Sequence, residues 1–181
     1  MKALRSALIL PALFCFAINT MAQADSTYCS RHALLYADSL ANAFRDQNWN
    51  RYLSITYPGI ISYYGGTRSF QSYIQRTRSV SNSFAIRDCV TLDLIQISAN
   101  HLGEWQCVIR KTGSTVIDGK KAMVISYLIG QSTDDGDSWK FLDVSYNATE
   151  KLNDIMPERF PALMVPERKI IFEKGELASA E

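Results

Sequence analysis

Few side chains in this sequence are suited to acid–base chemistry, and those few are far apart. His32 and His101 are the two histidines, and their separation does not suggest a metal site. The candidate catalytic residues are His101, in an expected hairpin loop, and Asp93, on the polar side of an expected strand. A general base needs a pocket and an orienting partner. We expect the side chains of Asp93 and His101 to be surrounded by solvent instead. No nucleophile, phosphate-loop or dinucleotide motif is present, so we expect no metal and no cofactor.

Tyrosine is unusually frequent, with 9 copies, most of them before the expected main sheet. A buried tyrosine hydroxyl needs a hydrogen-bond partner, whereas at a pocket mouth it can bind a ligand and the ring can stack on it. Ordinary packing in the core and at its rim is the alternative. The candidate ligand-binding residues are the aromatic side chains best placed to reach a pocket: Tyr36, Tyr52, Tyr64 and Trp105.

Residues 132–139, Ser-Thr-Asp-Asp-Gly-Asp-Ser-Trp, resemble the Asp-box pattern found on hairpins of several unrelated folds. The pattern predicts a structural turn in which Asp134 accepts backbone N–H groups, Gly136 supplies a positive φ and Trp139 packs below the hairpin. A calcium site is the alternative, because three aspartates lie close together. The distal glutamate of an EF-hand is missing, and a single box cannot build a propeller.

Composition and charge indicate a globular chain with no sequence-wide excess of positive charge that would attract polyanions. Of the 181 residues, 47% are apolar and 20% are charged, a balance typical of a folded domain. Lys and Arg number 19 against 18 Asp and Glu, for a formal net charge of +1. Nucleic acid is therefore not an expected partner.

The N-terminus has the pattern of a signal peptide. Lys2 and Arg5 precede an uncharged apolar run over 7–18, and the small-residue pattern Ala22-Gln23-Ala24 follows. The run is shorter than the roughly 20 residues that span a membrane, and Phe14 argues against lipidation at the next residue. We therefore expect an exported protein, periplasmic or secreted, that has no membrane partner after cleavage.

The predicted domain organisation is a signal peptide over 1–24, one domain over 25–175 and a flexible tail over 176–181. Three cysteines would remain after cleavage, which allows at most one internal disulfide. The sequence does not choose among the three pairings of Cys29, Cys89 and Cys107. Cys107 alternates with apolar neighbours, and we interpret it as a small buried residue rather than a nucleophile.

Apolar residues at helical spacing predict helices over 30–46, over 49–56 and from Thr67 to Thr77. Tyr57-Pro58-Gly59 is an expected turn, and Ile60 to Tyr64 an expected short strand. The first half of the domain is therefore predicted to run helix, helix, strand, helix.

From Phe84 onward the apolar period becomes two, which predicts strands. The alternation reverses at Ile95, which indicates a β-bulge that bends the strand. Further strands are expected from Trp105, over 122–131, over 138–145 and over 169–172. Asn147 or Thr149 is the expected cap of a short helix that runs through Met156. The predicted fold class is α+β, with N-terminal helices packed on a curved antiparallel sheet and a short C-terminal helical extension.

The stretch from about Tyr28 to Asn147 resembles the nuclear transport factor 2-like superfamily. The resemblance rests on Phe44 to Trp49, on Tyr57-Pro58-Gly59-Ile60-Ile61, and on Gly65-Gly66 before a helix with Phe70 and Ile74. It implies a cone-shaped fold whose curved sheet wraps the long helix around a pocket, and a homodimer through the exposed sheet face. The carboxylate base of the family's steroid isomerases is missing from 60–64.

Since fold alone assigns no activity, three functions follow as hypotheses. The leading one is an exported, noncatalytic domain that binds a small ligand or a protein partner. The first alternative is an isomerase or dehydratase that uses tyrosines with Asp93 or His101. The second is a structural or immunity-type interaction protein with a filled cone.

Overall fold

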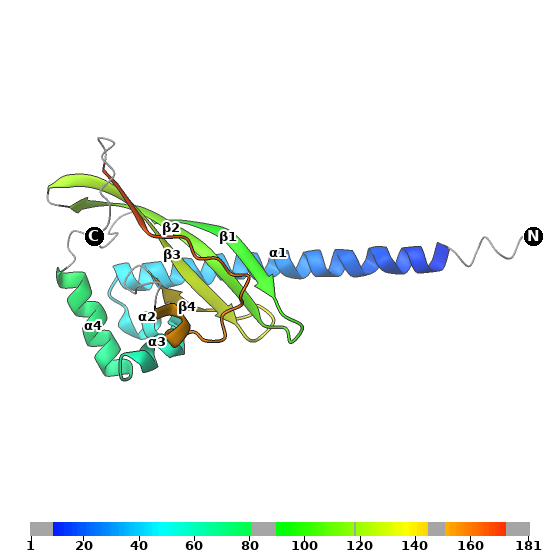
Figure 1. The fold of residues 1–181 in the computed structure, drawn as a ribbon, viewed down its shortest axis with the longest axis horizontal. Helices are drawn as coiled ribbons and strands as arrows, with labels where there is room; N and C mark the ends of the chain where they lie inside the picture. Colours follow the sequence, from blue (N-terminus) through cyan, green and yellow to red (C-terminus); the bar gives the residue numbers. More distant parts are fainter. Residues whose placement is uncertain (1–8, 81–89, 118, 145–150, 173–181) are drawn as a thin grey trace, which may run out of the picture.

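The protein has an α+β fold, in which N-terminal helices precede a curled antiparallel sheet (Figure 1). The computed structural model describes residues 9–80, 90–117, 119–144 and 151–172, and for 9–25 and 78–80 it describes the backbone alone. The predicted fold class is confirmed. Cys89, the expected first strand residues 84–89 and the expected tail 176–181 lie outside the described residues.

Three of the helices follow the predicted pattern. Helix α1 (Ile9–Arg45) begins before the expected start at Ser30, because no Gly or Pro interrupts the chain after Pro11. Helix α2 (Trp49–Ile55) is capped by Asn48, whose side chain accepts a hydrogen bond from the Arg51 amide at 3.1 Å. Helix α4 (Thr67–Val80) follows. Their buried side chains meet in one core: Cys29, Ala33, Ala37, Leu40, Tyr52, Ile55, Phe70 and Ile74.

The expected strand over 60–64 is wrong, because the structure has helix α3 (Pro58–Tyr63) there. Pro58 occupies the first turn, where its fixed φ suits a helix and its missing N–H costs nothing. Ile60 is buried in the core, while Tyr63 on the same short helix is exposed. The Tyr-Pro step therefore starts a helix, not the strand that the resemblance implies.

The sheet consists of β1 (Thr91–Ala99), β2 (Trp105–Ile117), β3 (Lys120–Ser132), β4 (Lys140–Asp143) and β5 (Lys169–Phe172). Strands β1 to β4 pair in sequence order, all antiparallel. Strand β3 is central, since β2 pairs along one edge, and β4 and β5 share the other edge. The predicted bulge is confirmed, because the β1–β2 register shifts between Leu94 and Gln96, leaving Ile95 exposed.

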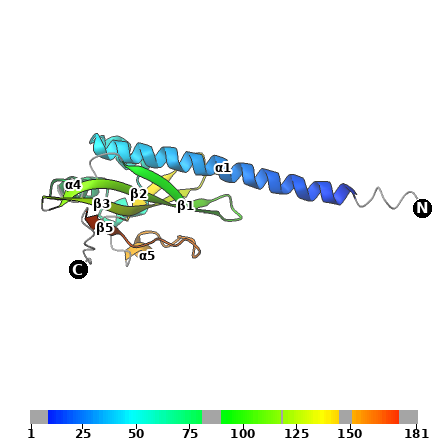
Figure 2. The ribbon, with the colours of Figure 1, turned by 90° about the horizontal axis from the view of Figure 1, so that it is seen from above.

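The sheet is covered on both faces, as the consecutive buried residues Cys107, Val108 and Ile109 require. Helix α1 lies on one face, and helix α5 (Leu152–Ile155) with the segment after it lies on the other (Figure 2). The Gln106 side chain on β2 holds that segment on the sheet with two hydrogen bonds. It donates to the Glu158 carbonyl at 3.1 Å and accepts from the Phe160 amide at 2.8 Å.

The two described cysteines of the expected mature chain lie on different elements and are not joined to each other. Cys29 on α1 donates a hydrogen bond to the Asp135 carbonyl, with a sulfur–oxygen distance of 3.4 Å. Cys107 on β2 is fully buried, as predicted, and burial raises the pKa of its thiol. A buried, protonated thiol is a poor nucleophile.

Candidate functional site

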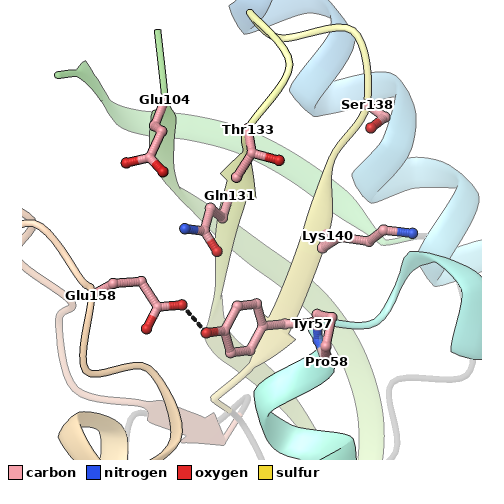
Figure 3. A pocket seen from close by; sticks show the side chains of 8 residues that line it. All are labelled: Tyr57, Pro58, Glu104, Gln131, Thr133, Ser138, Lys140 and Glu158. Atoms are coloured by element: carbon pink, nitrogen blue, oxygen red, sulfur yellow. Dashed lines mark hydrogen bonds between the residues drawn. The ribbon is translucent and has the colours of Figure 1, made fainter. Parts of the chain in front are cut away.

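A polar pocket of about 500 Å³ lies on the sheet face opposite α1 (Figure 3). Side chains alternate along β3, so Gln131 points away from the face on which Gly130 meets Cys107 and Phe141. The walls come from the start of α3, the β1–β2 hairpin, the end of β3, the turn after it, the start of β4 and the loop after α5. The lining residues are Tyr57, Pro58, Glu104, Gln131, Thr133, Ser138, Lys140 and Glu158.

Tyr57 is held in the pocket wall by backbone and side-chain contacts. Its amide donates to the Phe141 carbonyl at 2.8 Å, which ties the start of α3 to β4. Gly59 leaves room for the ring, because a Cβ there would collide with the Tyr57 ring and the Ile155 carbonyl oxygen. The hydroxyl donates a hydrogen bond to the Glu158 carboxylate. Burial, then this bond, raises the pKa of Tyr57, so the hydroxyl stays protonated at neutral pH.

Glu104 reaches the pocket from the β1–β2 hairpin. The Asn100 side chain shapes this loop, since its oxygen accepts from the amides of Leu102 at 2.9 Å and Glu104 at 3.1 Å. Its amide nitrogen then donates to the Glu104 carboxylate at 2.6 Å. The loop therefore orients an acidic side chain with neutral donors.

Lys140 contributes its aliphatic stem to the pocket, while its ammonium points away. The Lys140 Nζ donates to the Ser54 carbonyl at the end of α2, on the side of Lys140 remote from Glu158 (Figure 3). The two carboxylates and the Gln131 amide lie together on the other side of the pocket. The pocket is therefore acidic at one end.

The turn after β3 holds Thr133 and Ser138 at the pocket and is built on Asp134. The Asp134 carboxylate accepts hydrogen bonds from the Ser132 hydroxyl at 2.7 Å, the Ser138 amide at 2.9 Å and the Ser138 hydroxyl at 2.5 Å. Gly136 has φ +88° and a Cβ there would collide with Cys29. The Trp139 indole, fully buried, donates to the Gly136 carbonyl at 3.1 Å.

The Asp134 turn should make folding stability depend on acid pH. Burial alone would raise the pKa of Asp134, but hydrogen bonds from Ser138 and Ser132 outweigh it and hold the pKa below its ordinary value. The charged form therefore stabilises the fold fully above the unfolded pKa of about 3.9, and this contribution is lost as pH falls through the folded pKa. We expect Asp134→Ala to lower the free energy of unfolding by about 1–2 kcal/mol at pH 7.

Urea denaturation at pH 7 and at several pH values below 4 measures this effect. The gap between wild type and the variant should narrow as pH falls, because the wild-type carboxylate becomes protonated. Asp135→Asn is the matched control in the same turn, since Asp135 has φ +55°, which asparagine tolerates. A gap for Asp134→Ala that stays constant down to pH 2.5 would contradict the role of the charge.

The four aromatic residues proposed as ligand contacts lie outside the pocket. Tyr52 is buried against Phe44, and Tyr64 stacks on Tyr73 with ring centroids 4.2 Å apart. Tyr36 and Trp105 are half-buried against the core. The structure thus distributes these four side chains over α1, α2, the α3–α4 turn and β2.

The two candidate catalytic residues are also absent from the pocket lining. Asp93 on β1 accepts hydrogen bonds from the Arg110 guanidinium, at 3.0 and 3.2 Å, on the neighbouring strand. His101 is exposed in the β1–β2 hairpin. In the part of the chain that the structure describes, no three His, Cys, Asp or Glu side chains are grouped to hold a metal ion.

Sequence reasoning missed the acidic end of the pocket. Glu104 and Glu158 are far apart in the chain, and no local motif contains either of them. Tyr57 belongs to the tyrosine-rich first half, but only its contact with Glu158 distinguishes it from its neighbours. The polar residue Gln131 at the end of an apolar strand was the one available signal.

Comparison with known proteins adds no family to this description. No family model, no curated protein and no solved structure matches the chain. Among the described residues, no helix has both the length and the apolar character that crossing a membrane requires. A proposal of function therefore depends on the geometry of the pocket.

Proposed function

We propose that this chain is an exported, noncatalytic binding domain that takes a small polar ligand in the pocket opposite α1. One observation carries the proposal: side chains from separate chain segments converge on a cavity of about 500 Å³. That volume is within the range of small-molecule sites, roughly 300–1,000 Å³. The N-terminal signal pattern supports export, because Lys2 and Arg5 precede an apolar run and a small-residue pattern.

Two further features support a binding role over a catalytic one. Asp93 is engaged by Arg110 on the sheet, and His101 lies in an exposed loop, so neither candidate base lines the pocket. The curled sheet with its helices is compatible with the cone of the nuclear transport factor 2-like superfamily. Membership of that superfamily and a homodimer through the sheet remain predictions.

A fragment screen by NMR tests the proposal. We expect water-soluble polar fragments to shift the backbone amides of Glu104, Gln131 and Thr133 in the ¹⁵N-labelled protein. Thr133→Trp should abolish these shifts, because Thr133 is exposed at the pocket and a bulky side chain there fills it.

Ser114→Trp is the matched control. Like Thr133, Ser114 is an exposed hydroxyl residue, but it lies on β2 and outside the pocket. This variant should keep the wild-type response. If fragments shift only amides remote from the pocket, or if Thr133→Trp leaves the shifts unchanged, the pocket is not the binding site.

A further inference from the structure

The pocket contains two carboxylates whose charges are not neutralised by a cation of the described residues. Figure 3 shows the Glu104 and Glu158 carboxylates on the same side of the pocket, with the Gln131 amide between them. Their partners are neutral, the Asn100 amide for Glu104 and the Tyr57 hydroxyl for Glu158. The ion pairs between described residues are those of Asp46, Asp93 and Asp143, none of which lines the pocket.

Neutral donors satisfy lone pairs but leave the negative charge in place. Glu104 is half-buried and Glu158 is exposed at the pocket. Water therefore screens them in part, but two carboxylates in one concave site still reinforce each other's potential. Lys140, the cationic residue among the lining residues, donates from its ammonium to the Ser54 carbonyl instead. A ligand that carries a positive charge would therefore gain attraction at this end, whereas an anion would be repelled.

From this charge arrangement we infer that the pocket selects a cationic amine, an ammonium or guanidinium group carried by a small molecule or by a lysine or arginine side chain. This inference rests on the proposed binding function of the same pocket. The group would donate to Glu104 and Glu158, while Gln131, Thr133 and Ser138 offer polar contacts to the rest of the ligand.

NMR titration with matched probes tests the inference. The cationic probes are n-butylammonium, n-butylguanidinium and the peptide acetyl-Gly-Lys-Gly-amide, and the neutral and anionic counterparts are 1-butanol, acetyl-Gly-Met-Gly-amide and pentanoate. We expect each cation to bind at least about tenfold more tightly than its neutral counterpart. The affinity of the cations should fall as NaCl rises from 20 to 300 mM. Comparing the lysine peptide with n-butylammonium distinguishes a protein side chain from a free amine as the source.

Charge-removing variants locate the effect. The Glu104→Gln and Glu158→Gln pair keeps oxygen acceptors for Asn100 and Tyr57 but removes both charges, so cation affinity should fall at least about tenfold. Glu167→Gln is the matched control, because Glu167 is an exposed glutamate outside the pocket lining, and this variant should bind cations as tightly as wild type. Neutral fragments should still shift the pocket amides of the double Gln variant, which shows that the pocket is intact.

The outcomes separate this inference from the function on which it rests. If polar neutral fragments bind the pocket but cations bind no better, the charge selection is wrong and the binding function stands. If CaCl₂ alone shifts the pocket amides and the amines do not, the ligand class is a divalent cation and the inference is overturned. If no probe or fragment shifts the pocket amides, both proposals fail.

Discussion

Trp139→Ala should lower the free energy of unfolding by about 3–5 kcal/mol, the largest effect that we expect from a single substitution in this protein. The Trp139 side chain is fully buried and stacks on Phe141, with ring centroids 6.3 Å apart. Truncation leaves a cavity beneath the turn and removes the indole donor of the Gly136 carbonyl. Urea denaturation at pH 7 measures the loss.

Trp139→Phe separates the two contributions and covers the case in which the alanine variant does not fold. It keeps an apolar ring against Phe141 but cannot donate to Gly136, so its loss should be smaller than that of alanine, at about 1–3 kcal/mol. Loss of the turn should also reach the pocket, because Thr133 and Ser138 line it. A loss below about 1 kcal/mol for Trp139→Ala would show that the site is not a rigid part of the core.

The sheet was the most predictable part of the fold, because its alternation is local and has a fixed period. The reversed alternation at Ile95 predicted the bulge that the β1–β2 register shows. The apolar neighbours of Cys107 likewise predicted its burial. Both conclusions need only the rule that successive strand residues face opposite sides.

The misassigned helix α3 and the missed pocket have a different physical origin. A short apolar run such as 60–64 fits a strand or one helical turn equally well, and Pro58 before it decides in favour of the helix. The pocket needs Glu104 and Glu158 to line the same cavity. That arrangement depends on the hydrogen bonds by which Gln106 holds the segment after α5 on the sheet. No periodicity in the chain encodes such a long-range contact.

Two ion pairs cross the same sheet on opposite faces. Arg110 and Lys111 are consecutive residues of β2, so their side chains point to opposite sides. Lys111 pairs with Asp143 across the central strand on the α1 side, with side chains only 12% and 11% exposed. Arg110 pairs with Asp93 on the other side, with 46% and 43% exposed. The two pairs therefore differ chiefly in burial.

Removing one member of the buried pair should be costly. Asp143→Ala takes the carboxylate from the Lys111 ammonium in a poorly hydrated site, and we expect a loss of about 3 kcal/mol in the free energy of unfolding. The double variant Lys111→Met with Asp143→Leu removes both charges and should recover most of that loss, because apolar side chains of similar size avoid the desolvation cost. Urea denaturation of the wild type, Lys111→Met, Asp143→Leu and the double variant completes the cycle, and Asp143→Ala is measured beside it.

Asp93 and Arg110 provide the control cycle on the same strands. Because these side chains are about half exposed, water screens their attraction, and their coupling energy should be no more than about 1 kcal/mol. The coupling energy of Lys111 and Asp143 should exceed it clearly and should change less when NaCl is raised to 1 M, since salt screens exposed pairs more than buried ones. Equal coupling energies in the two cycles would mean that burial on the α1 side does not strengthen the pair.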